Sequence, residues 1–194
     1  HEFLTQPKIV EDMVRYVITQ PEPDADELRS FKYPYMACEV FCCEVPDILH
    51  VMVVADEGRL LDILFSFLEQ DAPLDNHLAG YFEKVLDMLF RHKTGPVMTY
   101  LNNNATTILG NFLKHMNNYS IMQLVQRLML PHIPFSISNE ESEPETSKCN
   151  WSILDQTCDL LCNKMLEGND VDTPPHISDL FITVMQPAPP EALI

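Results

Sequence analysis

The stretch Leu74–Phe90, LDNHLAGYFEKVLDMLF, carries the clearest structural pattern in the chain. Its apolar side chains recur at steps of three and four residues, at Leu78, Phe82, Val85, Leu86 and Leu89. The intervening positions include charged side chains, at Glu83, Lys84 and Asp87. This spacing places the apolar side chains on one face of an α-helix, so it predicts an amphipathic helix that packs against a core.

The same helical period continues on both sides of this stretch and predicts roughly nine short amphipathic helices. Breaks separate them, for example at Gln20–Asp24 and Asn102–Asn104. One helix is expected to begin at Pro34, and another is expected over Arg59–Gln70. The segment Val51–Val54 could also form a short strand, because its side chains are apolar and mostly β-branched.

These elements predict an all-α fold. We expect a helical-repeat, HEAT- or armadillo-like α-solenoid of about four repeats, since such repeats span roughly 40–47 residues; a globular helical bundle is the alternative. The expected divisions are helical repeats over 1–130, an acidic linker over 131–148, further helices of the same solenoid over 149–186, and a Pro-rich tail over 187–194. The linker is expected because residues 138–147 include no apolar side chain.

Composition excludes several functional classes. The chain has 194 residues, with 29 acidic and 12 basic side chains and a net charge of −17. Nucleic-acid binding and attachment to an anionic membrane both require an excess of Lys and Arg, so neither partner is expected. Only five glycines are present, whereas doubly wound nucleotide-binding folds need glycine in their phosphate loops.

No catalytic site is predicted, and no cofactor. Two cysteine pairs have helical spacing, Cys38 with Cys42 and Cys158 with Cys162, and together they could supply four thiolates to zinc. The other interpretation is that they are small buried apolar side chains, because repeats so far apart in a solenoid do not touch. We expect reduced thiols and a cytoplasmic protein, with the nucleus as a second location. The first residue, His1, suggests a portion of a longer protein.

Five ordered blocks carry a more specific signal than the helical period. They are FKYPYMACEV at Phe31–Val40, LFSFLEQ at Leu64–Gln70, LAGYFEKVL at Leu78–Leu86, RHKT at Arg91–Thr94 and SIMQL at Ser120–Leu124. In this order they resemble the SAPS domain of the regulatory subunits of protein phosphatase 6, a family also called phosphatase-associated proteins. The resemblance covers about the first 130 residues, as in a divergent or truncated member.

The resemblance implies a non-catalytic helical-repeat subunit that binds a serine/threonine phosphatase catalytic subunit of the protein phosphatase 6 type and directs its activity or targeting. It also implies ankyrin-repeat proteins as further partners. Two alternatives remain open from the residues themselves. The first is a helical-repeat interaction module with an unrelated partner, and the second is a metal-dependent enzyme built on the cysteine pairs.

Candidate partner-binding residues are Lys32 and Tyr33, in the first block, and Arg91 and Lys93, which form a basic cluster in an acidic chain. Each has a purely structural alternative. Tyr33 would pack between repeats with Lys32 in solvent, and the basic cluster would complement the dipole at a helix C-terminus.

The expected acidic linker contains three residues that could accept phosphate, Ser142, Thr146 and Ser147. The alternative is a passive linker.

Overall fold

A computed structural model of the chain describes residues 3–129, 154–167 and 173–185, and all of its regular elements there are helices. The α-helices are α1 (Pro7–Ile18), α2 (Tyr33–Cys42), α3 (Pro46–Val54), α4 (Arg59–Phe65), α5 (Asn76–His92), α6 (Thr94–Asn103), α7 (Ala105–Lys114), α8 (Tyr119–Met129), α9 (Leu154–Glu167) and α10 (Thr173–Met185). Three short turns join them: the π-helical η1 (Leu28–Lys32) and the 3₁₀-helical η2 (Ala55–Gly58) and η3 (Ser66–Glu69).

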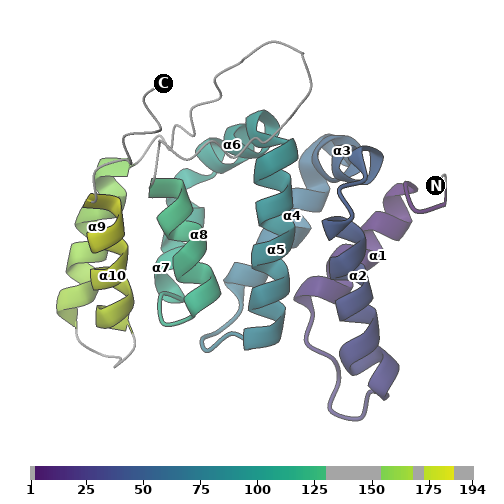
Figure 1. The fold of residues 1–194 in the computed structure, drawn as a ribbon, viewed down its shortest axis with the longest axis horizontal. Helices are drawn as coiled ribbons and strands as arrows, with labels where there is room; N and C mark the ends of the chain where they lie inside the picture. The colour runs from purple at the N-terminus through teal and green to yellow at the C-terminus, as the bar shows by residue number, and fades with distance from the viewer. Residues whose placement is uncertain (1–2, 130–153, 168–172, 186–194) are drawn as a thin grey trace.

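The helices stand in two layers that run from α1 and α2 at one end to α9 and α10 at the other (Figure 1). In one layer α2 packs on α5, α5 on α8 and α8 on α10. The other layer holds α1, α4, α7 and α9. The short helices α3 (Pro46–Val54) and α6 (Thr94–Asn103) lie beside these layers. The predicted all-α helical-repeat fold is confirmed.

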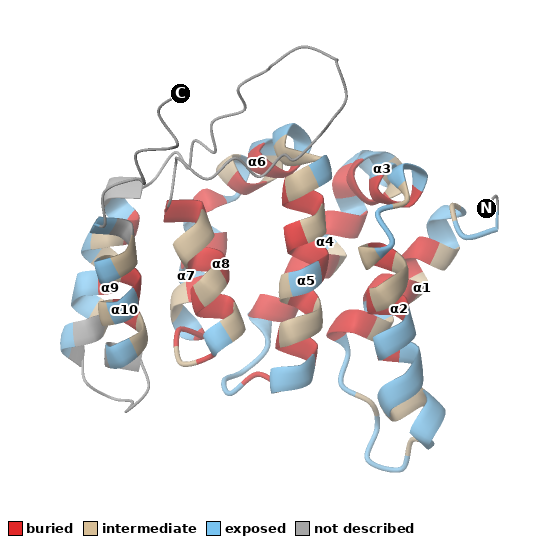
Figure 2. Cartoon of the chain, viewed as in Figure 1, coloured by how far each residue is buried: buried red, intermediate tan, exposed pale blue. Residues whose placement is uncertain are grey.

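The core lies between the layers (Figure 2). The predicted face of α5 is buried throughout: Leu78 is 5% exposed, and Phe82, Val85, Leu86 and Leu89 are 0% exposed. The Phe82 ring lies 5.2 Å from that of Phe67 and 5.9 Å from that of Phe65, centroid to centroid. Such aromatic contacts add to the stabilisation from burial.

A side-chain cap fixes the beginning of α5. Asp75 precedes the helix, and its Oδ1 accepts the backbone N–H groups of His77 at 2.9 Å and Leu78 at 3.0 Å. These donors have no partner within the helix, so the carboxylate satisfies groups that would otherwise need water. The cap therefore determines where the central helix starts.

Two local predictions are corrected or decided by the structure. The helix expected over Arg59–Gln70 ends at Phe65, and a 3₁₀ turn follows it. Ser66 Oγ donates a hydrogen bond of 2.7 Å to the carbonyl of Ile63, and such a local bond competes with helix propagation. The segment Val51–Val54 lies in α3, so the strand alternative was wrong.

Some predictions fall outside the described residues. These are the acidic linker over 131–148, with Ser142, Thr146 and Ser147, and the tail over 187–194. They stay predictions. Among the described helices, none combines the length and the apolar character needed to cross a bilayer.

Candidate functional site

Exposed apolar side chains concentrate where η1 runs into α2. Twelve large hydrophobic side chains are exposed among the described residues, and five of them lie within residues 28–36. They are Leu28 (42% exposed), Phe31 (67%), Tyr33 (41%), Tyr35 (49%) and Met36 (49%). Single exposed apolar residues are ordinary, but a concentration of them in one short segment is typical of a binding surface, and three of the five, Leu28, Phe31 and Tyr35, line one groove.

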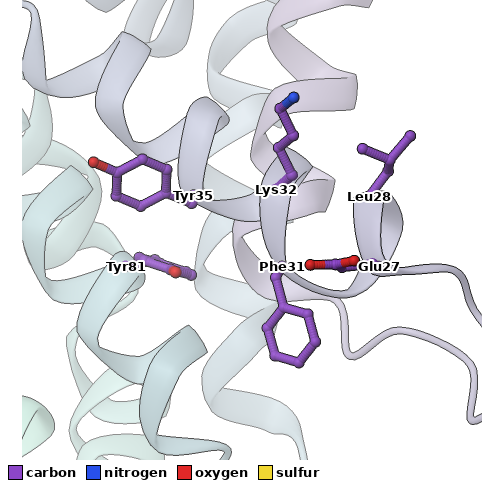
Figure 3. Close-up of a pocket in the computed structure, with 6 residues that line it drawn as sticks. All are labelled: Glu27, Leu28, Phe31, Lys32, Tyr35 and Tyr81. Atoms are coloured by element: carbon purple, nitrogen blue, oxygen red, sulfur yellow. The ribbon is translucent and has the colours of Figure 1, made fainter.

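Beside this group lies an open groove with a volume of about 510 Å³, which we call the aromatic groove (Figure 3). Its lining residues are Glu27, Leu28, Phe31, Lys32, Tyr35 and Tyr81. Tyr81 comes from α5 and lies next to Tyr35 of α2, so two helices build the groove. Aromatic rings, two phenol hydroxyls, a carboxylate and an ammonium group can therefore contact one bound molecule.

Pro34 accounts for the π-helical turn that shapes the groove. The helix that we expected to begin at Pro34 begins at Tyr33, one residue earlier and with Pro34 in its first turn, so this prediction is confirmed; what the sequence did not predict is η1, which directly precedes it from Leu28. Proline has no N–H to donate to the carbonyl four residues earlier, and its ring clashes with that carbonyl, here that of Ser30. The chain widens instead, and the Tyr33 N–H bonds the Leu28 carbonyl five residues earlier.

This wider turn explains why Phe31 is exposed. The buried stripe of α2 includes Cys38, and in an uninterrupted α-helix Phe31 would lie two turns earlier on the same stripe. The extra residue in the π-helical turn rotates the residues before it by about 100° around the helix axis, relative to their positions in a continuous α-helix. Phe31 is consequently 67% exposed and lines the groove.

The ionisable groups behind the groove are held in their neutral forms. Burial raises the pKa of the Tyr81 phenol above its ordinary value. Burial, together with the neighbouring Cys42, raises the pKa of the Cys38 thiol to about 12. A thiol in that state is protonated at neutral pH and is therefore a poor nucleophile.

The cysteine pairs do not combine into a metal site. Cys38 lies on α2 and Cys158 on α9, at opposite ends of the molecule (Figure 1). Within the described ranges, no group of three or more His, Cys, Asp or Glu side chains could hold a metal ion.

One of the four predicted partner-binding residues, Lys32, lines the groove, and a second, Tyr33, is its neighbour in the chain but not part of the lining. The ring of Tyr33 packs on that of Tyr16 with centroids 5.4 Å apart. Tyr33 is nonetheless 41% exposed, so it takes part in packing and in the surface.

The other two, Arg91 and Lys93, lie at the far end of α5. Arg91 is ten residues beyond Tyr81, which is about 15 Å along the helix. Its Nη2 lies 2.9 Å from Asp87 Oδ2, and Arg127 of α8 contacts the same carboxylate. Lys93 follows the last residue of α5. The structure thus does not bring these two residues to the groove.

Comparison with known proteins relates this chain to one family. It is 32% identical to mouse serine/threonine-protein phosphatase 6 regulatory subunit 2 over 139 residues, which is 72% of this chain and 15% of that protein. It is 31% identical to chicken serine/threonine-protein phosphatase 6 regulatory subunit 3 over 150 residues, 77% of this chain and 16% of that protein. The chain is a divergent relative of the phosphatase 6 regulatory subunits.

These regulatory-subunit relatives are much longer than the chain, which spans about one sixth of their length. A fission yeast relative, extragenic suppressor of kinetochore protein 1, is 25% identical over 135 residues, 66% of the chain and 16% of that protein. No family model matches the chain. No solved structure matches it either.

Several groove residues of this phosphatase 6 regulatory-subunit relative were missed from the sequence. Phe31 and Tyr35 lie within the first resemblance block but were not singled out, and Tyr81 lies in the third. Pro34 was an ambiguous signal, because proline is common in the first turn of a helix and also disturbs any helical turn before it. The apposition of Tyr35 and Tyr81 had no local signal, since only the packing of α2 on α5 joins them.

Proposed function

We propose that the chain is a non-catalytic regulatory subunit that binds a phosphatase catalytic subunit of the protein phosphatase 6 type and directs its activity or targeting. The observation that carries this proposal is the sequence similarity to phosphatase 6 regulatory subunits, at 31–32% identity over 72–77% of the chain. Because these relatives are named as regulatory subunits, the chain itself is proposed not to be an enzyme.

The fold supports this role physically. A stack of helical units presents an extended surface, and such surfaces bind large partners through many contacts. The exposed aromatic side chains at η1 and α2 supply the apolar anchors that dominate binding energy at interfaces. We therefore propose that the catalytic subunit contacts the aromatic groove, with Lys32, which lines it, and the neighbouring Tyr33 among the contact residues.

The test is co-purification from a cell lysate in low salt, with the tagged chain as bait and mass spectrometry for the phosphatase 6 catalytic subunit. We expect the wild-type chain to capture it and Phe31→Ser to lose it, while Ile182→Ser retains it. Ile182 is 57% exposed on α10, at the other end of the molecule, so it is a matched control. A folded wild-type bait that captures no phosphatase would overturn the proposal.

An unrelated partner is the competing function, an interaction module on the same fold. It would be favoured if the bait reproducibly captured another protein through Phe31 and captured no phosphatase. Gentle washing is essential to this comparison, because charge-assisted contacts of an acidic surface weaken as salt rises.

The family resemblance also motivates two finer proposals. Ankyrin-repeat proteins are proposed to join the complex with the phosphatase, which the same mass spectra would detect. The chain is proposed to act in the cytoplasm and also in the nucleus, where thiols such as the free Cys43 stay reduced. Imaging of the tagged chain in cells tests the location, and secretion would contradict it.

A further inference from the structure

The aromatic groove has the size and the wall chemistry of a site for a peptide side chain. Its volume of about 510 Å³ lies within the range of ligand pockets, roughly 300–1,000 Å³. Figure 3 shows Tyr35 and Tyr81 at one side, facing the helical turn that carries Phe31 and Lys32. An aromatic or aliphatic side chain between these walls would cover rings that are now exposed to water.

Charge next to the groove is predominantly negative. The segment 22–27 contributes four exposed carboxylates, and the last of them, Glu27, lines the groove itself; they are Glu22, Asp24, Asp26 and Glu27. Three cationic side chains lie nearby: Lys32, Arg29, and Lys84, an exposed residue of α5 whose charge acts on the Tyr81 phenol. Lys32 lines the groove, whereas the Arg29 guanidinium lies 4.9 Å from the centre of the Tyr16 ring and donates to the Thr19 carbonyl at 3.4 Å.

The local anchoring of this acidic segment keeps it beside the groove. Asp26 Oδ1 accepts the backbone N–H of Arg29 at 2.8 Å, and Ser30 Oγ donates to the Ala25 carbonyl at 3.3 Å. Both bonds tie the segment to η1, the turn that also carries Phe31. Glu27 and the aromatic rings therefore form one surface, and the other three carboxylates precede Glu27 directly in the chain.

We infer that the aromatic groove binds a short segment of the phosphatase catalytic subunit that carries an aromatic or aliphatic anchor flanked by lysine or arginine. The anchor lies between Phe31 and the two tyrosines, and the flanking cations pair with Glu27 and the acidic segment before it. The identity of the partner rests on the proposed function. The chemistry of the segment rests on the groove alone.

Other occupants fit the charges less well. A second copy of this chain carries a net charge of −17 and would oppose the acidic segment. The chain's own residues 138–147 contain four Glu and no basic residue, so they are repelled in the same way. Charge complementarity thus selects a basic partner segment.

The test uses the purified full chain and a random peptide library displayed on phage, panned at low salt. A peptide from the enriched pool is then synthesised with a fluorescent label, and its affinity is measured by anisotropy for wild type, Phe31→Ser and Glu27→Lys. Ile182→Ser and Asp159→Lys are the matched controls, since Ile182 and Asp159 are exposed on α10 and α9, remote from the groove. Circular dichroism confirms that each variant is folded.

We expect enriched peptides that carry a large apolar residue beside lysine or arginine. Phe31→Ser should weaken binding about tenfold or more, as for an interface anchor. Glu27→Lys should weaken it several-fold and reduce its salt dependence, because an attractive charge becomes repulsive. The controls should bind like wild type.

Several results would overturn the inference: no enriched peptide, enriched peptides without positive charge, or affinity that Phe31→Ser leaves unchanged. Self-association of the wild type that Phe31→Ser abolishes, measured by sedimentation velocity, would identify a second copy as the occupant and overturn it too. Failure of the proposed function is distinguishable. Peptide binding without capture of the phosphatase refutes the partner, whereas capture through Phe31 without basic peptide binding refutes the chemistry of the segment.

Discussion

An ion cluster between α5 and α8 includes Arg91, and its contribution to the free energy of unfolding can be measured by substitution. The Asp87 side chain is 9% exposed and contacts two guanidinium groups, Arg91 on its own helix at 2.9 Å and Arg127 on α8. The arginine side chains are 39% and 33% exposed, so each can turn to water if its partner is lost. The carboxylate cannot do so, and this asymmetry determines what each substitution costs.

Single substitutions should cost little. In Arg91→Ala the carboxylate keeps Arg127, and in Arg127→Ala it keeps Arg91. Each removes one partly exposed pair, for which we expect a loss of about 1 kcal/mol or less in the free energy of unfolding. The double variant leaves Asp87 buried and unpaired, and a buried charge without its partner costs about 3–5 kcal/mol. The loss of unfolding free energy in the double variant should therefore exceed the sum of the two single losses by more than about 1 kcal/mol.

The assay is urea unfolding of the full chain followed by far-UV circular dichroism. The double variant with Asp87→Ala added should regain part of the lost stability, because the unpaired charge is gone. Lys8→Ala is the control: Lys8 pairs with Asp12 at 2.7 Å, but these side chains are 71% and 44% exposed. We expect it to change stability by no more than about 0.5 kcal/mol.

Two results would refute this reasoning. Strict additivity of the arginine substitutions would show that the carboxylate is not energetically buried. Failure of Asp87→Ala to restore any stability to the double variant would show that the arginine side chains matter through packing and not through the charge.

Three further predictions concern named groups. Asp75→Ala should cost about 1 kcal/mol through loss of the α5 cap, or about 2–4 °C in Tm by calorimetry, while Asp71→Ala at an exposed position should change Tm little. Hydrogen bonds to Arg59 lower the pKa of Glu11 from 4.5 to about 2. The ionised carboxylate therefore stabilises the fold above pH 4.5, and this stabilisation is lost as the pH falls towards 2. The Tm difference between wild type and Glu11→Gln should shrink over that range of pH, and a constant difference would contradict the prediction. Burial lowers the pKa of His115, so protonation favours the unfolded chain, and wild type should lose more Tm than His115→Gln as pH falls below 6.5.

The parts of the fold that could be predicted are those in which local pattern and tertiary packing agree. The apolar period of α5 predicted its buried face because the helix is long and its apolar side chains recur on one side; the burial of Asp87 was not predicted, because it results from the packing of α8. The end of α4 could not be predicted, since the serine that ends it, Ser66, is equally compatible with a helix interior. Pro34 was ambiguous, because proline is common in the first turn of a helix and also distorts the turn before it.

The candidate site could be predicted only in part, because part of it lies in one sequence block and part depends on tertiary packing. Lys32 and Tyr33 could be selected because they lie in a block whose sequence resembles a family, but nothing local indicated that the surface there is hollow. The groove needs Tyr35 and Tyr81, which are 46 residues apart in the chain and meet only through the packing of α2 on α5. A surface made by two helices is a property of their packing, which helical periodicity alone does not encode.

Substitutions at the two ends of α5 should have different effects: those at the Arg91 end should change stability, and those at the aromatic groove should change binding. Native domains are stable by about 5–15 kcal/mol, so a loss of about 1 kcal/mol in Arg91→Ala leaves nearly every molecule folded and should leave phosphatase capture unchanged. Phe31 is 67% exposed, so Phe31→Ser should leave the unfolding free energy nearly unchanged and abolish capture. If Arg91→Ala abolished capture with unchanged stability, the prediction that Arg91 contacts a partner would be right, and the proposed restriction of the contact to the aromatic groove would be wrong. The pair of variants therefore decides between the two surfaces without any knowledge of the partner's structure.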